Sequence, residues 1–156
     1  MHGNIFTCED EEKITKDGLE NSSANLFPKN TILMAIYASP TLGRLGVLAN
    51  DASCNQASLG LIANEDLITW QWLFYKLIEL RDEFNLIAIG AGQQNISAEK
   101  VKNKKVLVPP KNMLDEFTEY ISSNFEQRKI LSLQINKLQE ARDRLLPKLM
   151  SGGIEV

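Results

Sequence analysis

The sequence predicts an α+β fold, in which a domain with a small mixed β-sheet, residues 1–111, precedes a long helical arm, residues 112–156. Three observations predict this arrangement. Short apolar segments separated by turn residues recur in the first part of the chain, as is typical of strands. Two later segments place apolar residues at helical spacing. The second of these continues into a seven-residue apolar repeat, which is typical of a coiled coil.

Three extended segments are expected to form the centre of the sheet. Residues 31–37 and 44–49 are apolar runs bounded by turn signals, which indicates buried strands. Residues 54–63 form the third segment, because their apolar side chains alternate onto one face. The short connections between these segments indicate a meander. Residues 86–89 and 105–108 are expected to be two further short strands.

Each of the two long helices is expected to carry an apolar stripe. Asp66 should cap the first, which runs to about Glu83 with Trp70, Leu73, Leu77, Leu80 and Phe84 on one face. Asn112 should cap the second, whose stripe consists of Leu114, Phe117, Ile121 and Phe125. Short helical turns are expected near residues 10–16 and after Ser97, which is a favoured capping residue.

The seven-residue repeat defines a seam along the end of the second helix. Alternating steps of four and three residues select Leu131, Ile135, Leu138, Arg142, Leu145 and Leu149. A seam this narrow predicts dimerisation through a two-helix coiled coil. Arg142 costs stability there, but it can fix the register or meet a carboxylate on a partner. Pro147 should kink or end the helix, and Gly152 with Gly153 should form a left-handed cap.

The composition excludes several classes of function. No apolar run is long enough to span a membrane, and the N-terminus lacks the features of a signal peptide, so we expect a cytoplasmic protein. Two cysteines without CxxC spacing and the single His2 leave almost no ligands for a metal site or groups for acid–base catalysis. The glycine-rich segment at residues 90–95 lacks the third glycine of a dinucleotide-binding loop. We therefore expect no catalysis, no metal and no cofactor.

The charge is unevenly distributed. The net charge is −3, and residues 1–30 hold six acidic residues against three lysines. Residues 100–111 hold five lysines and no acid, and residues 127–148 hold six basic residues against two acids. A local basic face can bind phosphates although the whole chain is acidic. Such runs are equally typical of a solvated surface.

Two loops combine glycine with side chains that can contact nucleic acid. Residues 39–44 include Thr41, Gly43 and Arg44, and residues 90–96 include Gln93, Gln94 and Asn95. Arginine can bind guanine through two hydrogen bonds, and glutamine or asparagine can do so with adenine. Threonine, lysine and main-chain N–H groups can hold phosphates. The same residues are common in ordinary hairpin turns, so the chemistry alone leaves both interpretations open.

Several motifs resemble specificity subunits of type I restriction–modification enzymes. Residues 141–152 read ARDRLLPKLMSG, which is similar to the string that ends each long helix in that family, although Gly153 stands where the family usually has Glu. Thr41-Leu42-Gly43-Arg44-Leu45-Gly46, Cys54-Asn55-Gln56-Ala57, Gly92-Gln93-Gln94-Asn95-Ile96 and Pro109-Pro110 occur in the order seen in the family's target-recognition domains.

The resemblance implies a DNA-binding subunit without catalysis of its own. Such a subunit reads one half of a bipartite target in double-stranded DNA, while its long helix pairs antiparallel with a counterpart and docks methyltransferase and possibly restriction subunits. The candidate DNA-binding residues are Thr41, Gly43, Arg44, Gln56, Gln93, Gln94, Asn95, Lys102, Lys104 and Lys105. Arg44 and Gln93 are the leading candidates for base contact, and the three lysines for phosphate contact.

The size of the chain implies that it acts with a partner. A complete subunit of the family has two domains and two helices, so we expect a half or truncated subunit that pairs with itself or with another half-subunit. A helix of about thirty residues is roughly 45 Å long, and successive major-groove sites on one face of DNA lie about 34 Å apart. The arm could therefore set the distance between two recognition domains. The alternative is a coiled-coil scaffold whose globular part binds protein instead of DNA.

Overall fold

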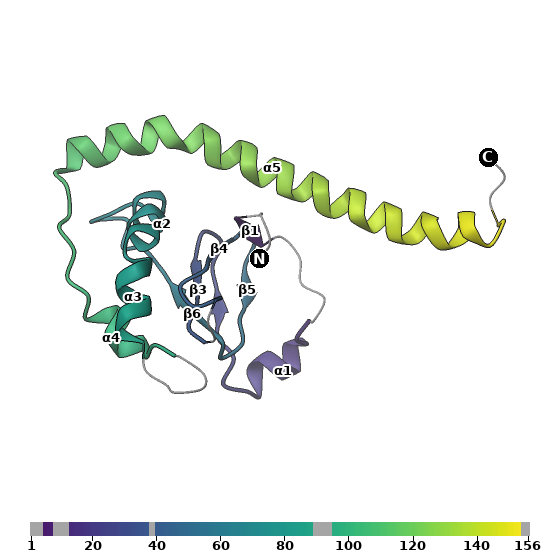
Figure 1. The fold of residues 1–156 in the computed structure, drawn as a ribbon, viewed down its shortest axis with the longest axis horizontal. Coiled ribbons are helices and arrows are strands. Elements are labelled where there is room, and N and C mark those ends of the chain that lie inside the picture. Colours follow the sequence, from purple (N-terminus) through teal and green to yellow (C-terminus); the bar gives the residue numbers. More distant parts are fainter. Residues whose placement is uncertain (1–4, 8–12, 38–39, 89–94, 154–156) are drawn as a thin grey trace.

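The computed structural model describes residues 5–7, 13–37, 40–88 and 95–153. Figure 1 shows a globular part that contains the sheets and the short helices, and one long helix, α5, that runs across it and continues beyond it. Both features confirm the α+β class. No helix among the described residues is long and apolar enough to cross a membrane.

The central sheet is mixed and has four strands in the order β1-β4-β3-β6. These strands are β1 (Phe6–Thr7), β3 (Ile32–Ala35), β4 (Leu45–Leu48) and β6 (Ser58–Leu61). β3 lies at its centre and is antiparallel to both β4 and β6, whereas β1 is parallel to β4. Ile32, Met34 and Val47 are completely buried. These apolar runs form strands because both faces of the sheet centre are covered.

The predicted meander is wrong, because the strands do not pair in the order in which they follow each other in the sequence. β6 pairs with β3 and not with β4, its predecessor among the long strands. Between them the chain forms β5 (Ala52–Ser53), which pairs with β2 (Leu26–Phe27) in a separate two-stranded sheet. This excursion carries the chain away from the edge of β4, so the next strand joins the opposite side of β3.

The helix expected at residues 66–83 is divided and shifted. α2 spans Trp70–Glu79, and its cap is Thr69, whose Oγ1 accepts a hydrogen bond from the Trp72 N–H at 3.4 Å. Asp66 is not the cap. α3 follows directly as Arg81–Ile87. The apolar stripe is confirmed, because Trp70, Leu77, Leu80 and Phe84 are buried and Leu73 packs against the same core.

Both additional strands predicted from the sequence are wrong within the described residues. Residues 86 and 87 belong to α3, because Phe84 and Leu80 continue the buried face at helical spacing while Leu86 is 84% exposed. Residues 105–108 form no strand, because all four are exposed, with Leu107 91% exposed, and they pair with no strand among the described residues.

The short helices lie close to the expected positions. α4 spans Ala98–Lys102, and its cap is Ser97 as predicted, with Oγ accepting from the Lys100 N–H at 3.4 Å. α1 spans Lys16–Glu20, later than the turn expected near residues 10–16, of which 10–12 lie outside the described residues. Thr15 caps α1 by accepting from the Gly18 N–H at 3.0 Å.

α5 spans Lys111–Met150 and follows Pro110 without a side-chain cap, so Asn112 does not have the predicted capping role. The expected stripe is confirmed, since Leu114 and Phe125 are buried and Phe117 and Ile121 are half-buried. The ring centroid of Phe125 lies 4.7 Å from the ring centroid of Trp70 and 5.7 Å from that of Phe74. The first half of α5 is therefore part of the core of the globular part.

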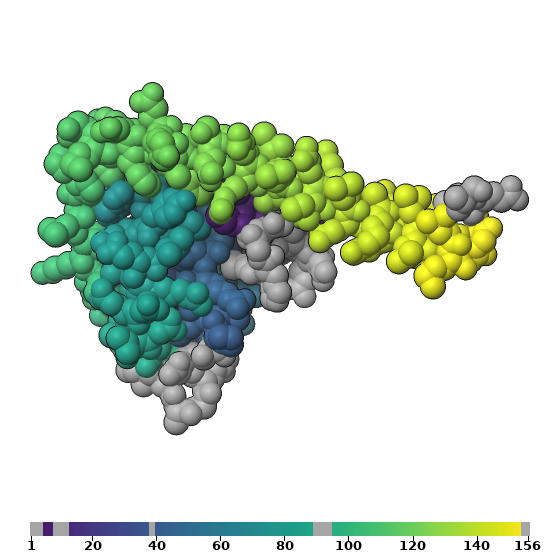
Figure 2. Space-filling view, turned by 45° about the horizontal axis from the view of Figure 1, so that its top comes forward, coloured from purple at the N-terminus to yellow at the C-terminus, as the bar shows by residue number. Residues whose placement is uncertain are grey.

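About the last third of α5 projects into solvent (Figure 2). Every residue from Lys137 to Met150 is exposed. With 40 residues, α5 is about 60 Å long, longer than the 45 Å expected. It continues three residues beyond Pro147 and ends in the predicted glycine cap, where Gly152 has φ +70° and the Gly153 N–H donates to the Lys148 carbonyl at 2.8 Å.

Candidate nucleic-acid interface

Three of the predicted segments meet at one end of the central sheet. β3 is antiparallel to its two neighbours, so the end of β3 lies beside the starts of β4 and β6. Beyond β3, Tyr37 forms an isolated bridge with Asn95. This arrangement brings residues 40–44, residues 54–57 and Asn95 to a common edge, which we call the recognition edge. Thr41, Gly43, Arg44, Gln56 and Asn95 from the predicted set all lie on it.

The turn at residues 40–43 is held from inside the domain. The Gly43 N–H donates to the Ala35 carbonyl at 2.8 Å, and the Ala35 N–H donates to the Arg44 carbonyl at 2.9 Å. The Leu42 side chain is completely buried, and Thr41 Oγ1 donates to the Tyr37 carbonyl at 3.0 Å. Gly43 has φ +73°, a conformation that favours glycine. The turn is therefore a defined platform for the side chain that follows it.

Arg44 is the cation that this turn presents. Its side chain is half-buried, and within the part of the chain that the structure describes no carboxylate forms an ion pair with it. A guanidinium carried by a turn with a defined backbone is suited to two parallel hydrogen bonds with guanine or with phosphate.

The second turn exposes an amide side chain. Asn55 Oδ1 accepts from the Ala57 N–H at 3.1 Å, which closes a tight turn and leaves Gln56 exposed at its tip. Cys54 Sγ donates to the Ser58 carbonyl at 3.6 Å, and burial raises the pKa of the Cys54 thiol. The thiol therefore stays protonated at neutral pH, and Gln56 offers an exposed amide at the tip of the turn.

The third segment is described only at its end. Gln93 and Gln94 lie outside the described residues. Asn95 is exposed, while the next residue, Ile96, is buried and donates its N–H to the Ile36 carbonyl at 3.1 Å. Asn95 is thus fixed beside the end of β3 by its own bridge and by the buried neighbour.

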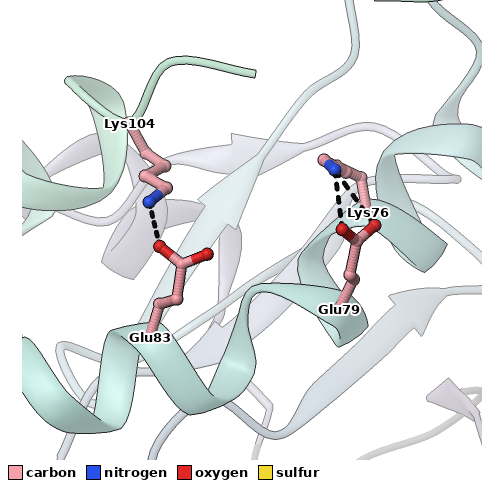
Figure 3. A network of polar contacts seen from close by, with 4 residues as sticks. All are labelled: Lys76, Glu79, Glu83 and Lys104. Atoms are coloured by element: carbon pink, nitrogen blue, oxygen red, sulfur yellow. Dashed lines mark hydrogen bonds and ion pairs between the residues drawn. The ribbon is translucent and has the colours of Figure 1, made fainter. Parts of the chain in front are cut away.

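The three predicted lysines differ in their surroundings. Lys102 and Lys105 are exposed and form no ion pair within the described ranges. Lys104 forms an ion pair with Glu83 of α3, as Figure 3 shows beside the separate pair of Lys76 and Glu79. Lys102 and Lys105 are therefore the better candidates for phosphate contact.

Two residues of α3 have roles that sequence patterns do not indicate. Glu83 holds Lys104, and Arg81 donates hydrogen bonds to two main-chain carbonyls of the turn at residues 40–43. Both lie on a helix whose sequence indicates only a buried stripe and a polar face. Their partners are distant in the chain, so no local pattern could identify them.

The seam residues of α5 are exposed. The exposed fractions are 54% for Leu131, 39% for Ile135, 70% for Leu138, 48% for Leu145 and 44% for Leu149. Arg142, which interrupts the seam, pairs with its neighbour Asp143 at 2.7 Å. This pair is exposed on both sides and contributes little to stability. The face therefore presents a row of apolar side chains to solvent.

Residues 2–140 match the family described as "Type I restriction modification DNA specificity domain". The chain belongs to this family. The match includes the whole recognition edge and the first thirty residues of α5, and it ends just before the C-terminal string at residues 141–152. The resemblance noted in the sequence is thereby confirmed on residues other than that string.

Two specificity subunits are similar to the chain over almost its full length. It is 24% identical over 160 residues to the type I restriction enzyme HindI specificity subunit of Haemophilus influenzae, in an alignment that covers 99% of this chain and 34% of that protein. The crystal structure of the type I restriction-modification system S subunit from M. genitalium matches with a TM-score of 0.60 and 20% identity, over 96% of this chain and 38% of that one. The chain thus has the fold of a specificity domain and spans a little over a third of these proteins.

Proposed function

We propose that this chain is a DNA sequence-specificity component of a type I restriction–modification system, which reads one half of a bipartite target and has no catalytic activity of its own. The match of residues 2–140 to the DNA specificity domain carries this proposal. The recognition edge supports it, because one end of the sheet presents an arginine and two amide side chains, Arg44, Gln56 and Asn95, which are groups that read base edges.

In this proposal Arg44 makes the main base contact. The turn before it is fixed by main-chain hydrogen bonds, so the backbone that carries the guanidinium loses little freedom when it meets guanine. Gln93 and Gln94 keep their predicted role as adenine-reading residues. Lys102 and Lys105 hold phosphates, and Lys104 joins them only if it exchanges Glu83 for a phosphate oxygen.

The arm has two proposed roles, which are dimerisation and recruitment of methyltransferase subunits. An antiparallel pair centred on residue 140, the middle of the seam, would place the two Phe125 side chains about 45 Å apart along the helix axis. Phe125 lies in the core of each globular part, so the pair would hold the two globular parts somewhat farther apart than one turn of DNA, which is about 34 Å. The second copy can be this chain or another half-subunit.

Binding to labelled duplexes at several salt concentrations tests the recognition role. The chain should first be used to enrich its preferred sequence from a randomised duplex pool. Arg44→Gln should reduce discrimination between the enriched and a scrambled duplex by about 5- to 150-fold, which corresponds to the loss of one bidentate base contact. Replacing Lys102 and Lys105 with Gln should weaken both duplexes equally and reduce the salt dependence.

Lys16→Gln is the matched control, because it removes one exposed positive charge from α1. It should leave discrimination unchanged. If the wild-type chain and its co-purified partner bind no duplex at low salt, the proposal is wrong and the scaffold alternative gains support. Co-purification with methyltransferase subunits tests the role of the arm separately.

A further inference from the structure

Arg81, the first residue of α3, donates two hydrogen bonds to the turn at residues 40–43. Its Nε donates to the Leu42 carbonyl at 3.3 Å, and its Nη2 donates to the Pro40 carbonyl at 3.1 Å. The two acceptors are two residues apart on the same turn. A guanidinium can hold both because its donors point in fixed, nearly parallel directions, which a lysine ammonium cannot reproduce.

The aliphatic part of Arg81 also shapes the turn. A Cβ atom built on Gly43 would lie 2.8 Å from Arg81 Cγ, so the backbone of the turn rests directly on this side chain. On its other side the turn is tied to β3 through the Gly43 N–H and the Ala35 carbonyl. The path of residues 40–43 is therefore fixed between the central sheet and Arg81.

Arg81 is itself held in place by the core. Leu80, which precedes it, and Phe84, one turn later in α3, are 6% and 1% exposed. Asn85 Nδ2 donates to the Arg81 carbonyl at 2.8 Å. Among the residues that the structure describes, no carboxylate forms an ion pair with Arg81. Its observed hydrogen bonds are thus directed at the main chain of the turn, which carries Thr41 and leads into Arg44.

We infer that Arg81 is a positioning residue for DNA recognition: it sets the conformation of the turn at residues 40–43, and through it the direction of Arg44, without touching DNA. This inference rests on the proposed function. A bidentate contact with a base depends on orientation, so a turn released from Arg81 loses discrimination before it loses general affinity for phosphate.

The test uses Arg81→Gln and Arg81→Lys, with Lys16→Gln as the control for a lost charge. Amide hydrogen exchange is measured at Gly43 and Arg44, whose N–H groups bond to Ala35 and Thr41 in the wild type. In both Arg81 variants these two amides should exchange about tenfold faster or more, because each variant loses the pair of hydrogen bonds that Arg81 donates to the turn. Exchange in α2 and in the core strands should stay as in the wild type.

Duplex binding then tests the consequence for recognition. Both Arg81 variants should discriminate about tenfold less between the enriched and the scrambled duplex, with the salt dependence of binding unchanged. Arg81→Lys keeps the charge and should not restore discrimination. If Arg81→Gln does not fold, Arg81→Lys carries the test with both measurements.

Two outcomes would overturn the inference. Unchanged exchange at Gly43 and Arg44 would show that the turn does not depend on Arg81. An equal loss of affinity for both duplexes, with a salt dependence reduced by about one ion in Arg81→Gln and preserved in Arg81→Lys, would make Arg81 a phosphate ligand instead. If the wild-type chain binds no duplex, the proposed function fails first, and the exchange measurement still shows whether Arg81 fixes the turn.

Discussion

Replacing Phe125 with alanine should be among the most damaging single changes in the chain. Its ring is 2% exposed and contacts four aromatic rings, at centroid distances of 4.7 Å to Trp70, 5.7 Å to Phe74, 5.9 Å to Tyr75 and 6.3 Å to Phe6. Truncation of a buried phenylalanine costs about 3–5 kcal/mol through lost burial and the cavity that remains. Since small proteins are stable by about 5–15 kcal/mol, this is a large fraction of the total.

Urea unfolding followed by circular dichroism measures this effect. The free energy of unfolding of Phe125→Ala should fall by about 3–5 kcal/mol with the same dependence on urea. Tyr120→Ala is the matched control, because Tyr120 lies on the same helix and is 84% exposed. It should change stability by less than about 0.5 kcal/mol. A loss below about 1 kcal/mol for Phe125→Ala, or equal losses for both variants, would refute the view that this ring fastens α5 to the globular part.

Three further predictions concern the turn, the seam and the partly buried thiol of Cys54. Gly43→Ala should lower the free energy of unfolding by about 1–3 kcal/mol in thermal unfolding, because it places a side chain at φ +73° and against Arg81. The loss should be smaller in an Arg81→Ala background. An equal loss in both backgrounds would contradict a contact between Gly43 and Arg81. Leu138→Glu should abolish self-association in sedimentation experiments, because it places a charge in the apolar seam. Gln139→Glu is the control, since Gln139 is the next residue but lies off the seam, and it should not affect self-association. Persistent dimers of Leu138→Glu would exclude the seam as the interface. Burial raises the pKa of the Cys54 thiol, so iodoacetamide should label the folded Cys8→Ser variant more slowly at pH 8 than the urea-unfolded chain. Because the folded pKa is the higher one, the contribution of this thiol to stability should be constant below the unfolded-state pKa and decline as pH rises towards the folded value; faster labelling of the folded chain would contradict this sign.

Local patterns predicted the elements whose side chains face the core. The apolar runs that became β3 and β4 and the stripe from Leu114 to Phe125 follow directly from burial. β1 was missed because Phe6–Thr7 is only two residues long and pairs with a strand about forty residues later. The apolar run at residues 86–89 predicts a strand as readily as a helix, because so short a run has no period that separates the two. Neither error could be corrected without knowledge of tertiary contacts.

The recognition edge shows the same division. Thr41, Arg44, Gln56 and Asn95 could be selected because their chemistry and their motifs are visible in the sequence, and the antiparallel pairing of β3 explains why they converge. Arg81 and the pairing of Lys104 with Glu83 could not be selected. The two carbonyls that Arg81 contacts are 39 and 41 residues away in the sequence, and Glu83 is 21 residues from Lys104. These interactions therefore exist only in the folded chain.

The continuity of α5 from the buried core to its exposed end has a thermodynamic consequence. Starting a helix is unfavourable, and extending one that already exists is not. Because the residues around Phe125 are ordered by the globular part, the residues beyond Asn136 extend an existing helix and do not have to nucleate their own. A partner that binds the exposed end therefore meets a surface that is already shaped, and most of the entropy lost in ordering it was lost when the domain folded.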